Sequence, residues 1–187
     1  IILIISAQAP LDLVIDTSER DIEIEPGISG TKVVLFGVTP TGKRDIIIEV
    51  VGPPENQTMQ EKRRFFGFWL GRGKSYYKNV PSYYNLLSSK PLQEITNEEG
   101  LNKLGLGIKH LPLGKANINY STIKQNEFDR RLRDEMYKNG QFLEKEGNII
   151  LRSGPGKVGL FKTEFSLPPN SLQGKYSVRY FLFQNNE

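Results

Sequence analysis

The chain has 187 residues, a length that fits one domain or one domain carrying a large insertion. Its 25 Lys and Arg against 21 Asp and Glu give a formal net charge of +4, a weaker basic bias than dedicated nucleic-acid-binding proteins show. The absence of Cys excludes disulfides, thiolate metal sites and a Cys nucleophile. We therefore expect a globular protein that does not bind nucleic acid.

Residues 1–9 are interpreted as the remnant of a signal peptide. An apolar run at residues 1–5 is followed by Ala7 and Ala9 in the A-x-A arrangement of a cleavage site. A buried first strand is the alternative interpretation of the same run. On the first interpretation, the folded domain spans residues 10–187.

Strand-like segments frame the chain at both ends. Alternation, or a run of β-branched residues, predicts strands at residues 11–16, 21–25, 32–38, 45–51, 148–152, 158–167 and 174–183. The third and fourth of these flank a Pro-Gly turn and are expected to form a central hairpin. The last opens with Gly-x-Tyr-x-Val after a Leu-Pro loop, a combination common in immunoglobulin-like domains. Short strands with turns at this spacing predict an immunoglobulin-like β-sandwich.

A helical segment at about residues 81–147 is predicted to interrupt this sandwich, which makes the chain mainly β with an α insertion. Pro81 is expected to begin a short helix over residues 81–89. Residues 96–99 can cap a further turn that covers Leu101 and Leu104. The clearest helix is expected at residues 126–146, because Phe128, Leu132 and Met136 recur at helical spacing and Phe142 and Leu143 extend their stripe. Gly140 weakens its middle.

Residues 62–84, KRRFFGFWLGRGKSYYKNVPSYY, are the densest cluster of large side chains. They hold the single Trp, three of the ten Phe and four of the eight Tyr. We interpret Trp69 and the neighbouring Phe residues as core side chains at the junction between the sandwich and its helical insertion. The basic runs at residues 62–64 and 130–133 could meet lipid head groups or a partner, or could be solvated faces.

Two glycine motifs resemble nucleotide-binding loops, but the residues around them do not fit such loops. Residues 71–75 resemble the end of a phosphate-binding loop, but Phe68 stands where the full pattern requires Gly, and the residues that follow are strand-like. Gly154, Gly156 and Gly159 match the spacing of a dinucleotide fingerprint, but a strand follows instead of a helix.

No catalytic or metal constellation is found in the sequence. The only His is His110, in a loop-like region, and no nucleophile-elbow pattern supports it. One His without Cys does not predict a zinc or copper site. We therefore predict no catalytic residues, no metal and no cofactor, and we lean towards a protein that is not an enzyme.

An ordered set of segments runs through the chain: LFGV (35–38), DIIIEVVGP (45–53), GFWL (67–70), VPSYY (80–84), SSKPL (88–92), LGLG (104–107), LFKTEFSLP (160–168) and GKYSVRYFLF (174–183). This set resembles a family of putative transmembrane proteins found in alphaproteobacteria. The resemblance implies a signal sequence, an extracytoplasmic domain and one membrane helix, here expected after Glu187. It also implies a membrane-protein partner, through an association with sulfite-exporter-type permeases. It brings no activity and no catalytic residues.

We predict a non-enzymatic binding or accessory module at the periplasmic face of the inner membrane, with a membrane-protein partner such as a transporter. The candidate binding residues are Arg63, Arg72, Lys74, Tyr76 and Tyr83. The alternative is a protein that binds or processes an anionic small molecule around residues 63–84. That alternative requires a concave pocket in which Tyr side chains converge with Arg63, Arg64, Arg72 and Lys74. A purely structural role and the oligomeric state stay open.

Overall fold

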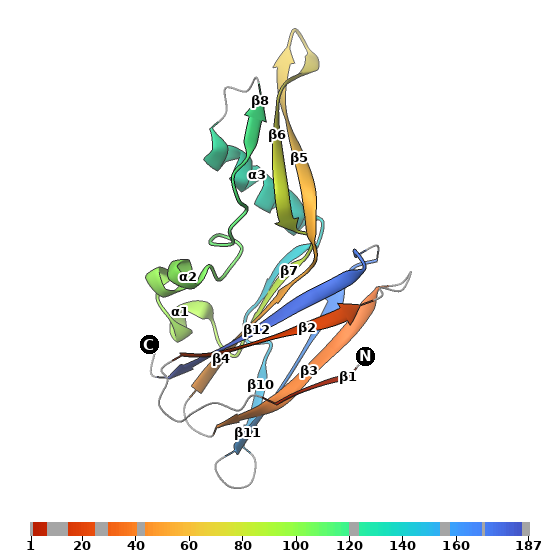
Figure 1. Ribbon diagram of the computed structural model, residues 1–187. Coiled ribbons are helices and arrows are strands. Elements are labelled where there is room, and N and C mark those ends of the chain that lie inside the picture. Colours follow the sequence, from red (N-terminus) through yellow and green to blue (C-terminus); the bar gives the residue numbers. More distant parts are fainter. Residues whose placement is uncertain are drawn as a thin grey trace.

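The computed structural model describes residues 2–6, 15–24, 30–40, 44–119, 124–153, 158–169 and 171–184. In this part of the chain the strands form three sheets (Figure 1). The first sheet has the order β1 (Ile2–Ser6), β3 (Thr31–Pro40), β11 (Val158–Leu167), β10 (Ile150–Ser153). The second has the order β2 (Ile15–Ile24), β12 (Gly174–Gln184), β4 (Arg44–Val51), β7 (Tyr84–Ser88), β9 (Phe142–Lys145). The third has the order β5 (Pro54–Phe65), β6 (Phe68–Pro81), β8 (Asn117–Asn119).

Three helices of the described residues lie between β7 and β9: α1 (Leu92–Ile95), α2 (Glu98–Leu104) and α3 (Gln125–Lys138). A mainly β chain with a helical segment is therefore confirmed. The segment also contains β8 and β9, and it is less helical than the sequence indicated.

The first and second sheets pack face to face around one hydrophobic core. The first sheet contributes Val33, Leu35, Phe161, Phe165 and Leu167. The second sheet contributes Ile46, Ile48, Val50, Val178, Tyr180 and Leu182. These positions alternate along β3, β4, β11 and β12, as the two-residue period of a strand requires. Each fully buried side chain of this size stabilises the fold by about 1.5–3 kcal/mol.

The opposite face of the second sheet is buried as well. Along β4, Ile46 and Ile48 point into the sandwich, whereas Ile47 between them belongs to a second core. The second core is built from the sheet and the helical segment, by Tyr84, Leu86, Phe142, Phe181, Leu101, Leu106, Phe128, Leu132 and Met136. Strands buried on both faces read as continuous apolar runs, and this explains the Ile-rich sequence of β4.

The pairing of β4 with β7 continues into β5 and β6. The register is the same in both ladders. It pairs Ile47 with Ser88 and Val51 with Tyr84 in the sheet, and Pro54 with Pro81 and Glu55 with Val80 at the base of β5 and β6. Between the two ladders, the backbone N–H of Gly52 donates to the carbonyl of Tyr83 at 2.8 Å, and that of Ser82 donates to Pro53 at 3.0 Å. A single long antiparallel pair therefore leaves the sandwich and rises away from it (Figure 1).

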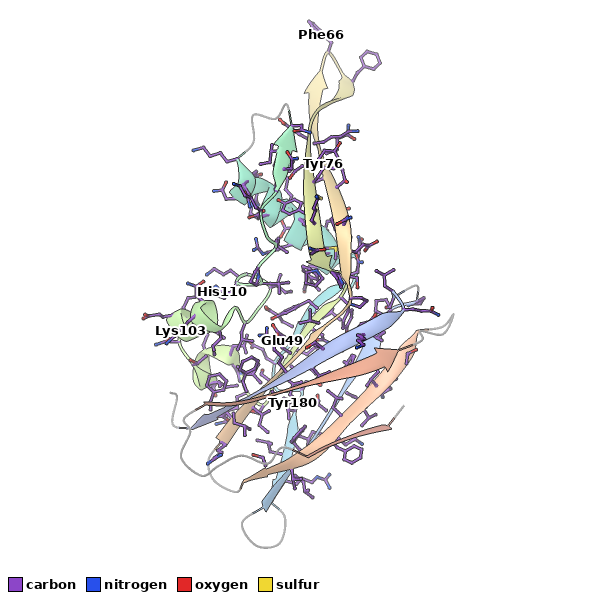
Figure 2. All side chains as sticks on the ribbon, in the orientation of Figure 1. Glu49, Phe66, Tyr76, Lys103, His110 and Tyr180 are labelled. Carbon is purple, nitrogen blue, oxygen red and sulfur yellow. The ribbon has the colours of Figure 1, made fainter. Side chains whose placement is uncertain are left out.

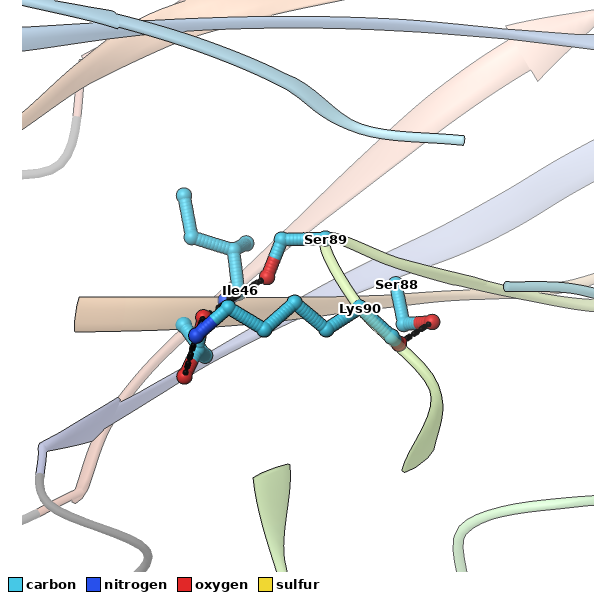
Figure 3. Close-up of polar contacts among 5 residues, drawn as sticks. Ile46, Ser88, Ser89 and Lys90 are labelled. Carbon is cyan, nitrogen blue, oxygen red and sulfur yellow. Dashed lines mark hydrogen bonds and ion pairs between the residues drawn. The ribbon is translucent and has the colours of Figure 1, made fainter. Parts of the chain in front are cut away.

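Polar contacts fasten the opposite end of this pair (Figure 3). Ser89 Oγ accepts a hydrogen bond from the backbone N–H of Ile46 at 3.0 Å, and Ser88 Oγ donates to the carbonyl of Lys90 at 2.6 Å. The ammonium group of Lys90 lies 3.0 Å from the carboxylate of Asp45. These bonds satisfy backbone groups where the ladder between β7 and β4 ends.

Residues 84–88 form β7, so the short helix expected over residues 81–89 is wrong. Every residue of β7 is buried. Tyr84 and Leu86 face the second core, and Leu87 faces the sandwich core. A run of large side chains buried on both faces cannot be told from a buried helix by periodicity.

The expected hairpin between residues 32–38 and 45–51 is also wrong, because β3 and β4 lie in different sheets. β3 pairs with β1 and β11, and β4 pairs with β12 and β7. The two strands contribute to the same core from opposite sides, which gives both of them the composition of buried strands.

Helix α3 ends at Lys138, eight residues before the expected end. Gly140 follows with a φ of 71°, a conformation that favours glycine and stops a helix. Phe142 and Leu143 then belong to β9, which runs parallel to β7. The buried stripe of Phe128, Leu132 and Met136 is confirmed, as is the cap of α2, where the Asn97 side chain accepts from the Gly100 N–H.

β1 is an edge strand of the first sheet, and β12 lies inside the second sheet. Residues 2–6 pair in parallel with β3, which corresponds to the strand alternative for this segment. Residues 7–14 lie outside the described part, and the signal-peptide interpretation stays a prediction. β11 has the expected bounds, and β12 extends one residue beyond them. None of the helices in the described segments is long and apolar enough to cross a membrane.

A buried carboxylate joins the second sheet to the helical segment. Glu49 on β4 is fully buried and forms an ion pair with Arg179, its cross-strand neighbour on β12. The Tyr84 hydroxyl hydrogen-bonds to Glu49 and accepts the backbone N–H of Gly107 at 2.8 Å. Burial and the nearby Glu49 charge raise the pKa of Tyr84. A buried charge persists only when it is paired and hydrogen-bonded in this way.

Replacing Glu49 with Ala is expected to destabilise the fold by about 1.5–3 kcal/mol, because the half-buried Arg179 and the buried Tyr84 would lose a charged partner. Urea unfolding followed by far-UV circular dichroism measures the loss. The matched control is Glu164→Gln, which breaks an exposed ion pair with Lys32 and should leave the unfolding midpoint unchanged. Equal midpoints for the two variants would contradict a structural role for Glu49.

Candidate binding surface on the ribbon

The ribbon, defined as β5, β6 and the turn between them, is the part of the molecule that extends furthest from the two cores (Figure 1). β6 has 14 residues, which at the usual rise corresponds to about 45 Å and is longer than most strands. In the described residues, β8 pairs with β6 only at residues 74–76. The outer part of the ribbon is therefore two-stranded, and it continues the ladder of the second sheet.

One face of the ribbon packs against the helical segment. Tyr77 is buried in the second core, and its hydroxyl donates to Asp129 Oδ1 on α3 at 2.6 Å. Burial, followed by this hydrogen bond to a carboxylate, raises the pKa of Tyr77. Met59 lies on the same face, opposite Ser75, and packs against the second core. These contacts fix the inner half of the ribbon to α3.

The other face of the ribbon is open to solvent. Lys74 is exposed and Tyr76 is 40% exposed, and they alternate with the buried Ser75 and Tyr77. Opposite them on β5 stand Gln60 and Thr58, both exposed. Tyr is enriched in the cores of protein interfaces, and Lys74 adds a cation to the same face.

Two irregularities interrupt the pairing of the ribbon. Lys62 faces Gly71 and Glu61 faces Gly73, so Arg72 is the extra residue of a β-bulge. A second shift lies between Glu55 and Gln57, opposite the part of β6 where Asn79 has a φ of 58°. Asn tolerates this left-handed conformation better than most residues. Bulges increase the local twist, and they are frequent beside functional sites.

The ribbon ends in a two-residue turn. Phe65 pairs with Phe68, and the residues between them, Phe66 and Gly67, have φ angles of 44° and 86°. Positive φ at both positions defines a type I′ turn, which matches the twist of a hairpin. Phe66 is 87% exposed and Phe68 is 74% exposed, and Figure 2 shows Phe66 at the outer end of the ribbon. The expectation that the Phe run is core is therefore wrong for these two residues.

The first position of a type I′ turn is unusual for phenylalanine. Asn, Asp and Gly are preferred there, because the left-handed conformation costs other residues about 1–2 kcal/mol. Phe66 carries this strain and also exposes a large apolar ring. A strained and exposed aromatic residue is a reason to look for function at the turn. Gly67 at the second turn position could have indicated this hairpin from the sequence. Phe66 before it hid the signal, because Phe is not a usual turn residue.

The five residues expected to bind a ligand or partner are not brought to one place. Arg63 and Arg72 lie on β5 and β6, and their side chains fall outside the description. Lys74 and Tyr76 share the open face. Tyr83 is buried in the sandwich core, where its hydroxyl donates to the carbonyl of Ser166 at 3.1 Å and accepts from Asn85. Of the five residues, the structure thus brings Lys74 and Tyr76 together and separates Tyr83 from them.

Two clefts are described, and neither includes Lys74 or Tyr76. One, of about 270 Å³, lies at the base of the ribbon and is lined by Glu55, Ser82, Tyr83, Asn139, Gln141, Pro168, Pro169, Ser171 and Leu172. Its charged residue is a carboxylate, which does not favour an anionic ligand. The other, of about 360 Å³, lies on the first sheet beside Ile150, Arg152 and Lys162. The alternative of an anionic ligand around residues 63–84 therefore gains no support.

His110 takes part in a surface ion cluster. Its Nε2 lies 3.3 Å from Glu98 Oε1, which also pairs with Lys109. The hydrogen bond from Lys109 is the main cause that lowers the pKa of Glu98. Among the described residues, no group of three or more His, Asp or Glu side chains is arranged to hold a metal ion.

A protein-family model described as Putative transmembrane protein (Alph_Pro_TM) matches residues 12–187. This match confirms the resemblance drawn from the ordered segments of the sequence, and it includes the ribbon. No curated protein and no solved structure matches the chain.

Replacing Phe66 with Asn is expected to stabilise the protein by about 1 kcal/mol, because Asn adopts the left-handed conformation with less strain. For a chain of this size the melting temperature should rise by about 2–4 °C, which differential scanning fluorimetry resolves. The control is Gly67→Ala in the same turn. Open space surrounds Gly67, so its φ of 86° alone should make Ala destabilising. A lower melting temperature for Phe66→Asn would contradict strain at the turn.

Proposed function

The chain belongs to the family described as Putative transmembrane protein, and on that premise we propose that it is the extracytoplasmic domain of a membrane-anchored protein. The domain faces the periplasm and acts as a non-enzymatic binding or accessory module for a membrane-protein partner such as a transporter. Its body is an immunoglobulin-like sandwich, and the ribbon is its binding element.

One observation carries this proposal: the ribbon extends beyond both cores and exposes Tyr76 beside Lys74 on its open face. Exposed aromatic groups cost free energy in water and mark interaction sites when they gather on a protruding element. The ribbon is also anchored in the second sheet, through the continuous pairing of β4 and β5 with β6 and β7. A rigid binding element loses less conformational entropy on association than a flexible loop would.

The partner surface is the open face of the ribbon. Tyr76 offers a large amphipathic contact area, and Lys74 beside it offers a cation. Arg72, at the bulge, and Arg63, on the facing strand, extend the basic character of this region in the sequence. We expect a partner with acidic groups around an apolar contact.

Site-specific crosslinking tests the proposal in the full-length protein in its native membranes. A photoreactive residue in place of Tyr76 should capture one membrane protein reproducibly, and Lys74→Glu should reduce the yield by about fivefold or more because it reverses a charge at the interface. The same residue in place of Lys103, which is exposed on α2, should capture nothing specific.

Two results would contradict the binding of a membrane-protein partner at the open face. One is the absence of a reproducible crosslink from position 76. The other is an equal yield from positions 76 and 103, since contact would then be random collision. A circular dichroism spectrum of each variant checks that the variant is folded.

A further inference from the structure

We infer that the tip of the ribbon, residues 62–72, seats in the surface of an anionic phospholipid bilayer. The two exposed rings enter the boundary between head groups and acyl chains, and the flanking cations bind lipid phosphates. This inference rests on the proposed function, in which the ribbon binds a partner that is held in a membrane. It assigns the tip to lipid and leaves the open face around Tyr76 to the protein partner.

The rings have the exposure and the position that insertion requires. Phe66 lies at the apex of the turn and Phe68 begins β6, and both are largely exposed. Figure 2 shows Phe66 at the outermost point of the ribbon, well away from the sandwich. A flat membrane can therefore reach the tip before it meets the body of the protein. In the sequence, Trp69 follows Phe68, and Trp is enriched at membrane interfaces.

The charges around the rings complement an anionic surface. The charged residues between positions 62 and 72 are all cations, namely Lys62, Arg63, Arg64 and Arg72. They stand on both strands of the tip, and the sequence has no Asp or Glu between these positions. Cations of this kind attract anionic head groups, and the long side chains of Lys and Arg can follow the phosphates.

The spacing between rings and cations fits the depth of the interface. Arg64 precedes Phe66 by two residues and Lys62 precedes it by four, which at the rise of a strand is about 7 and 13 Å of backbone. Interfacial segments bury their apolar groups by about 5–10 Å. For a ribbon that stands upright on the membrane, rings at this depth place the backbone of residues 62–64 at about the level of the phosphates.

Co-sedimentation of the purified 187-residue chain with vesicles tests the inference. We expect binding to vesicles of phosphatidylcholine and phosphatidylglycerol in a 70:30 ratio, and about tenfold weaker binding or less to pure phosphatidylcholine. The double variant Phe66→Ser and Phe68→Ser should lose at least about tenfold in affinity, because both rings leave the acyl boundary. The triple variant Lys62→Gln, Arg63→Gln and Arg64→Gln should lose about fivefold for each cation.

Matched controls separate the tip from the rest of the surface. Tyr137→Ser removes an exposed aromatic ring from α3, and Lys103→Gln removes an exposed cation from α2. Both should bind the anionic vesicles as the original chain does. Unchanged melting temperatures show that each variant is folded.

Several outcomes would overturn the inference. No binding to anionic vesicles, or equal binding by the original chain and both tip variants, excludes lipid as the occupant of the tip. Equal binding to neutral vesicles excludes the role of the cations. A photoreactive residue at position 68 that captures a protein, without vesicle binding, assigns the tip to a protein partner. If vesicle binding fails while the crosslink from position 76 persists, the proposed function stands and only the lipid contact is lost.

Discussion

One antiparallel pair of strands determines where the exposed aromatic side chains of the ribbon lie. This pair begins between the two cores as β4 and β7, keeps its register past the two prolines at the base of the ribbon, and ends at the type I′ turn. Because the second sheet is buried on both faces, its central strands cannot tilt without opening a core. The direction of the ribbon is therefore set by the packing of the sheet.

The helical segment supports this arrangement from one side only. The Tyr77 hydroxyl donates to Asp129 on α3, and Met59 packs against the second core, so the inner half of the ribbon is held. The buried ion pair of Glu49 with Arg179 lies beneath the same segment, and Tyr84 links it to the loop after α2. These contacts leave the opposite face and the tip exposed. The ribbon is therefore fixed at its base and open at its end, which is the geometry that the proposed binding role requires.

Much of the fold could be predicted from local patterns. The strands at residues 158–167 and 174–183, the cap at Asn97 and the apolar stripe of α3 follow from alternation, side-chain capping and helical period. Local patterns did not separate β7 from a helix, because its residues are buried on both faces. They also could not place β3 and β4 in different sheets, since strands that line one core from opposite sides have the same composition. The candidate site residues stay a prediction, of which Lys74 and Tyr76 share an exposed face and Tyr83 is buried. The Phe residues of the same segment were expected to be buried, because a large apolar residue predicts burial unless contacts distant in the sequence carry it outward.

The fluorescence of Trp69 tests the central claim most directly, because this residue is the only Trp in the chain and follows Phe68. Its emission is measured as anionic vesicles are added, with acyl chains that carry bromine at defined depths as quenchers. If a rigid ribbon delivers its tip into the interface, the emission shifts to shorter wavelength and is quenched most strongly by bromine close to the head groups. An emission spectrum that stays unchanged and unquenched at saturating vesicle concentration would contradict the account.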